Sequence, residues 1–245
     1  MERRPLVAAN LKMNDLPEGA LEEDSPFRER GNADVIAIPT FLDIDKCIGK
    51  YIITGAQYGG RFDVAEGAYT GDISMQMLYD RRVRYVLCGH SERRELHNES
   101  NDNVIEQAVA VLKHNMHPII CVGENSEQRK TGKEKDVVSE QLAGFPFNSV
   151  SYTVAYEPIW AIGEKALRAA TPEEAEEMHA YIRSLLDEEH RAVTRILYGG
   201  SVKPNDEAGK MIRQPNIDGF LVGGCSLQLD KFKGILDIVN EATGE

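Results

Sequence analysis

The sequence has little cysteine, a single tryptophan and no long apolar run. Its four cysteines lie 41, 33 and 104 residues apart, which fits neither a small disulfide framework nor a paired zinc site, so we expect reduced thiols. No apolar run approaches the ~20 residues that a membrane span needs, and the first ten residues hold no stretch apolar enough for a signal peptide. We therefore expect a cytoplasmic protein with no membrane partner.

Basic side chains are also scarce, since 28 Lys and Arg stand against 40 Asp and Glu, giving a net charge of −12. Such a chain repels the phosphate backbone of nucleic acid, so we expect no nucleic-acid partner. An anionic ligand would have to be held by local donors. The nucleotide-binding glycine motifs are absent, and none of the six histidines belongs to a His-Glu-x-x-His pair, so the residues support neither a cofactor nor a catalytic metal.

What the chain does contain is a regular alternation of two patterns. Segments of helical periodicity, such as 103–113 and 172–189, separate short apolar runs that resemble buried strands. A strand and a helix about every thirty residues is the rhythm of a parallel sheet, and eight units without a linker predict one (β/α)8 barrel domain over residues 1–245. The eight runs are Leu6–Ala9, Asp34–Ile38, Tyr51–Ala56, Tyr85–Cys88, Pro118–Val122, Tyr152–Tyr156, Arg195–Tyr198 and Gly219–Val222.

Two helix starts are well marked in the sequence. Thr171 precedes Pro172 and two glutamates and forms a capping box with Glu174, and the run 204–207 opens a second helix. In contrast, the segment 15–31 contains two prolines and a glycine in positions that interrupt a regular helix. We expect the first helix to be short or broken.

Polar residues and glycines follow several of the predicted strands. Each alone has an ordinary explanation: a histidine at a strand end is often structural, a lysine there is often merely exposed, and a glycine pair is often a turn. In a barrel, however, the carboxyl ends of all strands meet at one face, where the active site lies. These residues therefore predict one site: Asn10, Lys12, His90, Ser91, Glu92, Glu124, Glu157, Gly199, Gly200, Ser201, Gly223 and Gly224.

The chemistry of this group suits a phosphorylated carbonyl compound. Glycine-rich turns expose backbone N–H groups that hold a phosphate, and Lys12 adds a positive point charge. A carboxylate at Glu157 facing an imidazole at His90 across the pocket suits removal of a proton next to a carbonyl. Because His90 precedes a predicted helix start, we expect the helix dipole to keep its ring neutral.

Seven strings of the sequence, in order along nearly the whole chain, resemble the triosephosphate isomerase family. This resemblance implies a TIM barrel that interconverts dihydroxyacetone phosphate and D-glyceraldehyde 3-phosphate in glycolysis and gluconeogenesis, as a homodimer without a cofactor or metal. The strings are AANLKMN (8–14), GAYTGDIS (67–74), CGHSERR (88–94), CVGE (121–124), AYEPIWAIG (155–163), ILYGGSVKP (196–204) and DGFLVGG (218–224).

The resemblance also implies a role for individual residues. Glu157 would be the base, His90 the neutral electrophile, and Lys12 with Asn10 would stabilise the negative charge of the enediolate. Glu92 would orient Lys12. Backbone N–H groups of the phosphate site would come from Gly163, Ser201, Gly223 and Gly224.

A mobile lid over about residues 158–170 is implied as well, with one hinge at 158–160. The chain departs from the family pattern here, because the stretch 164–170 between Gly163 and Thr171 is two residues longer than usual, so we expect an active enzyme whose lid closes imperfectly. The loop 57–67 is also two residues longer, and Tyr58 and Leu11 replace an asparagine and an aromatic residue. In the family this loop enters the partner subunit, which would place Thr70 against the partner's Asn10.

Two other interpretations remain open from the sequence. One is a different phosphosugar enzyme on the same barrel, such as an aldolase or a ribose-derived isomerase, because fold and phosphate site alone do not define a reaction. The sixth strand offers no Schiff-base lysine for that chemistry. The other is a barrel that has kept the fold as a binding or structural module without catalysis.

Overall fold

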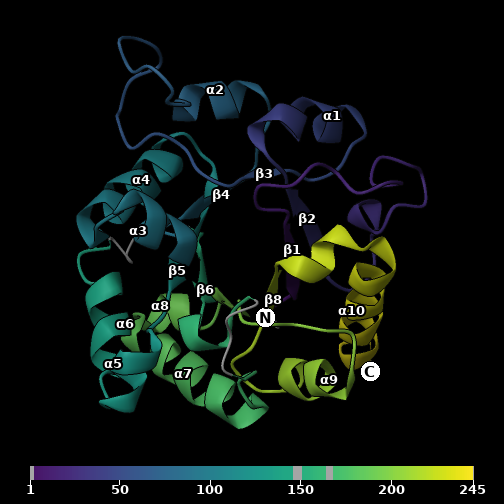
Figure 1. Cartoon of the computed structure of the whole chain (residues 1–245), viewed down its shortest axis with the longest axis vertical. Helices are drawn as coiled ribbons and strands as arrows, with labels where there is room; N and C mark the ends of the chain where they lie inside the picture. Colours follow the sequence, from purple (N-terminus) through teal and green to yellow (C-terminus); the bar gives the residue numbers. More distant parts are fainter. Residues whose placement is uncertain (1–2, 146–150, 164–167, 245) are drawn as a thin grey trace.

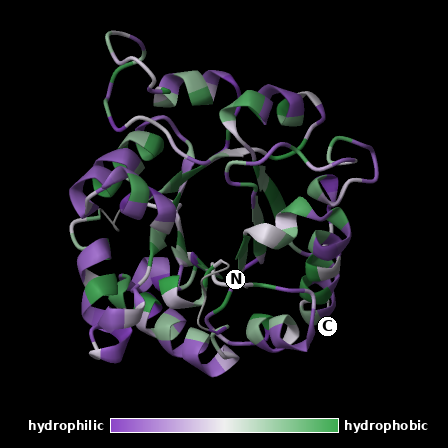
Figure 2. Cartoon of the chain, viewed as in Figure 1, coloured by the Kyte–Doolittle hydropathy of each residue, from purple (hydrophilic) through white to green (hydrophobic). Residues whose placement is uncertain are grey.

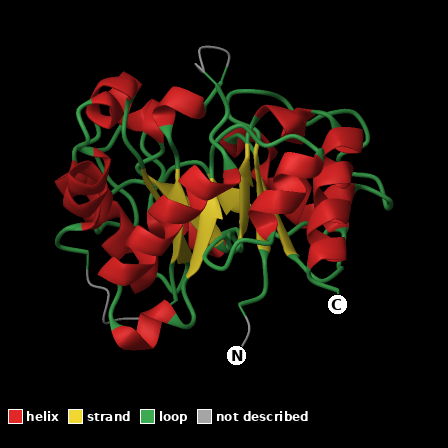
Figure 3. Cartoon of the chain, turned by 90° about the horizontal axis from the view of Figure 1, so that it is seen from below, coloured by secondary structure: helices red, strands yellow, loops and turns green. Residues whose placement is uncertain are grey.

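The computed structural model describes residues 3–145, 151–163 and 168–244. Eight parallel strands form an inner layer, and helices surround it (Figure 1; Figure 3). This arrangement confirms the predicted (β/α)8 barrel. The strands are β1 (Leu6–Asn10), β2 (Asp34–Ile38), β3 (Gly55–Ala56), β4 (Tyr85–Cys88), β5 (His117–Val122), β6 (Thr153–Tyr156), β7 (Arg195–Tyr198) and β8 (Gly219–Val222).

The barrel closes unevenly around its circumference. The strands are hydrogen-bonded in the order β2-β1-β8-β7-β6-β5-β4-β3, so the seam lies between β2 and β3. There a single parallel bridge joins Ala37 and Thr54, with the Ala37 N–H donating to the Ile53 carbonyl. The predicted third strand was too long, because Tyr51 takes a left-handed φ of 59° in the turn after α1 (Ile44–Gly49) and cannot continue an extended strand.

The helices follow the strands as a βαβ pattern requires. No α-helix lies between β1 and β2, where the described residues hold only the 3-10 turn η1 (Pro26–Arg28), so the expected short first helix is confirmed. The others are α2 (Met75–Asp80), α3 (Ser91–His97), α4 (Asn101–Lys113), α5 (Ser126–Lys130), α6 (Glu134–Leu142), α7 (Pro172–Leu185), α8 (Glu188–Arg191), α9 (Asp206–Ile212) and α10 (Leu229–Ala242), with 3-10 turns η2 (Phe41–Asp43), η3 (Ile159–Ala161) and η4 (Gly224–Leu227).

The ends of the helices are set by local capping residues more than by the periodicity of apolar residues in the sequence. The capping box at Thr171 is present, with both of its reciprocal hydrogen bonds. The predicted helix 172–189 was too long, because Leu186 is buried in an extended conformation and Asp187 caps a separate helix by accepting the His190 N–H. At the start of α9 it is Asn205 that serves as the cap.

Alternate strand residues build two apolar layers. One set points into the barrel and fills it, whereas the other packs outward against the apolar faces of the helices, whose outer faces are hydrophilic (Figure 2). All four cysteines are free thiols. The inward set is Leu6, Ala8, Ile36, Ile38, Leu87, Ile119, Cys121, Ala155, Leu197 and Leu221.

An added methyl group at Gly219 tests how closely the backbones of β8 and β1 approach each other. Gly219 has a φ of 133°, and a Cβ there would lie 2.0 Å from the Leu6 carbonyl oxygen on the neighbouring strand. We expect Gly219→Ala to lower the free energy of unfolding by about 3 kcal/mol or more, measured by urea denaturation. Gly49→Ala is the control, because a Cβ at Gly49 meets no atom within 4 Å. Equal unfolding midpoints for the two variants would contradict the expected clash.

Candidate active site

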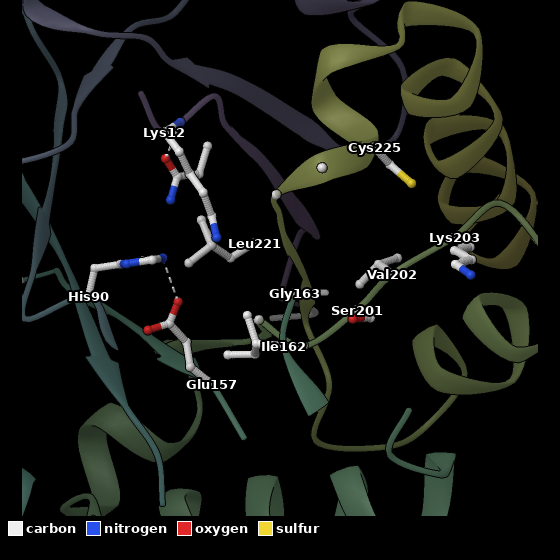
Figure 4. A pocket seen from close by; sticks show the side chains of 15 residues that line it. Lys12, His90, Glu157, Ile162, Gly163, Ser201, Val202, Lys203, Leu221 and Cys225 are labelled. Atoms are coloured by element: carbon white, nitrogen blue, oxygen red, sulfur yellow. Dashed lines mark hydrogen bonds and ion pairs between the residues drawn. The ribbon is translucent and has the colours of Figure 1, made fainter. Parts of the chain in front are cut away.

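A cavity of about 290 Å³ lies at the carboxyl ends of the strands, at the face where the sequence placed the site (Figure 4). All eight residues predicted to act on or bind the substrate line this one cavity, although they come from distant parts of the chain. They are Asn10, Lys12, His90, Glu157, Gly163, Ser201, Gly223 and Gly224. Their individual roles stay predictions.

Lys12 reaches the cavity from a strained backbone. Its φ is 52°, in the left-handed region that non-glycine residues rarely adopt. The side chains of two neighbours hold it there: the Lys12 N–H donates to Asn10 Oδ1 at 3.0 Å, and Gln57 Nε2 donates to the Lys12 carbonyl at 2.7 Å. The ammonium pairs with Glu92 Oε1 at 2.5 Å, which agrees with the orienting role expected for Glu92. Sequence reasoning missed Gln57, because nothing in its local pattern marks it.

His90 is the N-cap of α3, and both of its ring nitrogens are engaged. The Glu92 backbone N–H donates to Nδ1 at 3.3 Å, and a nitrogen that accepts a hydrogen bond carries no proton. In this neutral tautomer the proton is on Nε2, which lies 3.0 Å from Glu157 Oε1. The ring therefore offers its N–H toward the cavity side, where a carbonyl oxygen would accept it.

Glu157 is almost fully buried, with an exposed fraction of 2%. Burial alone would raise its pKa, but contact with His90 and the hydrogen bond from the Ser91 N–H to Oε2 at 2.9 Å outweigh this, and the net shift is downward. The carboxylate is thus ionised at neutral pH, the form in which a carboxylate can accept a proton.

The same contact changes the expectation for His90. Burial alone would lower the pKa of His90, but the charge of Glu157 raises it overall. The helix dipole considered from the sequence is therefore not the only influence on the ring, and the net shift runs against it. The prediction that Glu157 and His90 face each other across the pocket was also incomplete, because in this structure they touch. If His90 is the predicted electrophile, Glu157 occupies the position on Nε2 that a substrate carbonyl would take.

The phosphate end of the cavity has a similar contact. The Ser201 N–H and Oγ both donate to the Ala161 carbonyl, at 3.1 and 2.9 Å, so this predicted phosphate donor is occupied by the protein itself. Gly223 lies against Lys12, since a Cβ there would be 3.4 Å from the Lys12 Cε. The lysine and the glycine turn thus share one wall of the cavity.

Trp160 lies beside the site, with its indole 6% exposed and packed in the hydrophobic core. Its role at a hinge stays a prediction. Its Nε1 donates to Glu124 Oε1 at 2.7 Å, and the fully buried Glu124 also accepts from the Tyr156 hydroxyl. Of the lid predicted over 158–170, residues 164–167 lie outside the described residues, so its closure stays a prediction.

Among the residues that the structure describes, no group of three or more His, Cys, Asp or Glu side chains is placed to hold a metal ion. Within the same residues, no helix combines the length and apolar character needed to cross a membrane. The polar groups of the cavity include the Glu157 carboxylate, the His90 imidazole, the ammonium groups of Lys12 and Lys203, and the glycine turns.

An eight-stranded barrel with acid–base groups gathered at its carboxyl face defines the class of (β/α)8 barrel enzymes. The sequence model of one family in this class, described as triosephosphate isomerase, matches residues 5–241. The chain belongs to the triosephosphate isomerase family.

Curated relatives with that name match over their full length. Triosephosphate isomerase from Coxiella burnetii (strain Dugway 5J108-111) is 42% identical over 260 residues, covering 99% of this chain and 100% of the relative. The protein from Shewanella sediminis is 39% identical, covering 98% and 99%. That from Caldanaerobacter subterraneus subsp. tengcongensis is 40% identical, covering 96% and 99%.

The left-handed backbone at Lys12 predicts an unusual order of stability. Lys12→Gly and Lys12→Ala both remove the ammonium, but only glycine adopts a φ of 52° without cost. We expect the glycine variant to be more stable by about 1 kcal/mol in thermal or urea unfolding. At Lys50, where φ is −104°, the order should reverse, because glycine there only adds entropy to the unfolded chain. The same order at both positions would contradict strain at Lys12.

Proposed function

We propose that this chain catalyses the interconversion of dihydroxyacetone phosphate and D-glyceraldehyde 3-phosphate through an enediolate. One observation carries the proposal: a single cavity brings together Glu157, His90 and Lys12 with the glycine turns after β7 and β8. Family membership agrees with it, since the relatives carry the name of this enzyme.

In this proposal Glu157 removes a proton from C1 of dihydroxyacetone phosphate, and the electron pair of that bond moves toward the C2 carbonyl oxygen. His90 Nε2–H donates to the oxygen, and Lys12 with Asn10 offsets the developing negative charge. His90 then carries the proton of the C1 hydroxyl to the C2 oxygen, and return of the proton from Glu157 to C2 leaves an aldehyde at C1 and a hydroxyl at C2. The support is geometric, because Glu157 and His90 lie 3.0 Å apart and both line the cavity.

Before a substrate can bind in this way, groups of the site must exchange their hydrogen-bond partners. Glu157 breaks its contacts with the Ser91 N–H and with His90. The Ser201 N–H breaks its hydrogen bond to the Ala161 carbonyl and donates to the phosphate instead. Backbone N–H groups of Gly163, Gly223 and Gly224 complete the phosphate site. These local donors compensate for the protein's net charge of −12, which by itself disfavours an anionic substrate.

The two alternative functions fit the site less well. A Schiff-base enzyme needs a lysine at the sixth strand, but β6 reads TVAY, and the cavity's two lysines, Lys12 and Lys203, follow β1 and β7. A barrel without catalysis would gain nothing from an ionised Glu157 that is 2% exposed, because burying such a charge is costly. The cytoplasmic location and the lack of a nucleic-acid partner stay predictions.

Variants at Glu157 test the proposed reaction. We expect the wild-type protein to convert glyceraldehyde 3-phosphate in a coupled assay, and Glu157→Asp to lower kcat by ~10²-fold because the carboxylate retreats by about 1 Å. Glu157→Gln removes the base and should lower kcat further. Glu127→Gln, on the exposed side of α5, is the control and should match the wild type. An inactive wild-type protein, or an unimpaired Glu157→Asp, would refute the proposed function.

We further infer that two copies of the chain assemble through the face beside Lys12. A cavity of about 480 Å³ lies there, and large apolar side chains near it are exposed, including Met13 (93%), Leu42 (85%) and Leu96 (70%). The connection between β3 and α2 projects beyond the ring of helices (Figure 1), as a segment that enters a partner would. A second copy would thus cover apolar surface next to the site.

A charge at the centre of this face tests the assembly. Met13→Glu places a carboxylate where the second copy would bury it without a partner, so we expect the dimer to dissociate to a monomer in light-scattering chromatography. Val193→Glu alters another exposed apolar residue, just before β7, and should leave the mass unchanged. A monomeric wild-type protein, or a dimeric Met13→Glu variant, would rule the inferred interface out.

A further inference from the structure

The cavity of the site contains a second lysine that the proposed reaction does not use. Lys203 follows β7, lines the cavity and is exposed to solvent. Figure 4 shows it beside Ser201 and Val202. His90 and Glu157 lie on the opposite side of the cavity in the same view. A charged group in this place acts on a ligand both before and after the ligand enters.

The backbone holds Lys203 in a defined turn. Pro204 restricts the chain after it, and the Asn205 N–H donates to the Lys203 carbonyl at 2.9 Å. Pro204 in turn packs on α10, since a Cβ at Gly234 would lie 2.9 Å from the Pro204 Cβ. Ser201 is two residues earlier, and two residues of chain span at most ~7 Å. The lysine is thus held next to the predicted phosphate donor.

The Lys203 ammonium has no acidic partner among the residues that the structure describes. Lys12, the other lysine of the cavity, pairs with Glu92 at 2.5 Å. A paired ammonium is largely neutralised at a distance, whereas a free one keeps its field. That field reaches Cys225 on the same wall. Burial raises the pKa of the Cys225 thiol, and the charges of Lys231 and Lys203 act against this shift.

The charges around the reacting groups do not favour an anion without Lys203. Glu92 and Glu157 stand there against the ammonium of Lys12. His90, in the neutral form described above, adds no charge. The whole chain contributes a net charge of −12, and a phosphate ester is close to a dianion at neutral pH. An unpaired cation beside the phosphate end therefore has a large relative effect.

We propose that Lys203 determines the preference of the site for phosphorylated ligands, because its free ammonium attracts the dianion into the cavity and stabilises it there. The inference rests on the proposed function for the identity of the substrate, but not for the charge of the ligand. The phosphate keeps its charge throughout the reaction. The effect is therefore equal for the bound substrate and the transition state, and it appears in KM and not in kcat.

A series of charges at position 203 tests the inference in the full chain. The measured quantity is kcat/KM for glyceraldehyde 3-phosphate at an ionic strength of ~0.01 M. For a unit charge and a dianion ~8 Å apart in water, Lys203→Gln should lower kcat/KM about 3-fold and Lys203→Glu about 10-fold, through KM at unchanged kcat. Lys203→Arg keeps the charge and should match the wild type. At ~0.5 M salt the variants should converge to within about twofold.

Two controls separate the local field from other effects. Lys50→Glu changes the net charge by the same amount, but Lys50 lies between α1 and β3, at the amino ends of the strands. It should therefore change kcat/KM by less than about 1.5-fold. D-glyceraldehyde, the same aldose without its phosphate, should be converted equally by the wild type and by Lys203→Glu. A loss of structure around position 203 would instead impair both substrates.

Equal kcat/KM values for the wild type and Lys203→Glu at low salt would overturn the inference, and so would a loss that persists at high salt or extends to D-glyceraldehyde. If Lys203→Glu fails to fold, Lys203→Gln decides by the same criteria. An inactive wild-type protein would count against the proposed function alone. Calorimetry with glycerol 3-phosphate, a dianion without a carbonyl, then decides the inference: its Kd should rise about 10-fold in Lys203→Glu at low salt, and an unchanged Kd would refute the role of Lys203.

Discussion

The site depends on keeping one ionised carboxylate out of water. Burying a charge without partners is expensive, so Glu157 requires donors, and the fold supplies them from the start of α3: the Ser91 N–H and the His90 ring. The barrel brings them together because β4 and β6 both end at the same face. In the proposed reaction, Glu157 must leave the same groups that offset the cost of its burial.

This competition extends across the cavity. Ser201 is bound to Ala161, just as Glu157 is bound to His90. In the proposed reaction, residues at and after the end of β6 therefore occupy the donors that the phosphate and the carbonyl would take.

The strands and the site residues could be predicted because their signals are local. Most of the apolar runs are bounded by polar residues or glycines, and the residues that follow must meet at one end of a parallel barrel. The direct contact of Glu157 with His90 could not be predicted, because it depends on side-chain rotamers across two strands. Gln57 supports Lys12 from 45 residues away in the chain, and no spacing rule connects the two. Helix α7 ends at the extended residue Leu186, although the apolar periodicity of the sequence would continue the helix.

The weak seam between β2 and β3 has a consequence for assembly. Gln57, directly after β3, also donates to the Ile38 carbonyl at the end of β2, so one amide fastens the seam and supports Lys12 at once. The apolar face beside Lys12 lies above this same join, since Phe41 and Gln57 both line its cavity. In the inferred dimer, the binding free energy of the second copy would add to the cohesion of these two strands. Association of the two copies and integrity of the barrel wall would then be thermodynamically linked, and dilution alone would loosen the backbone beneath the lysine.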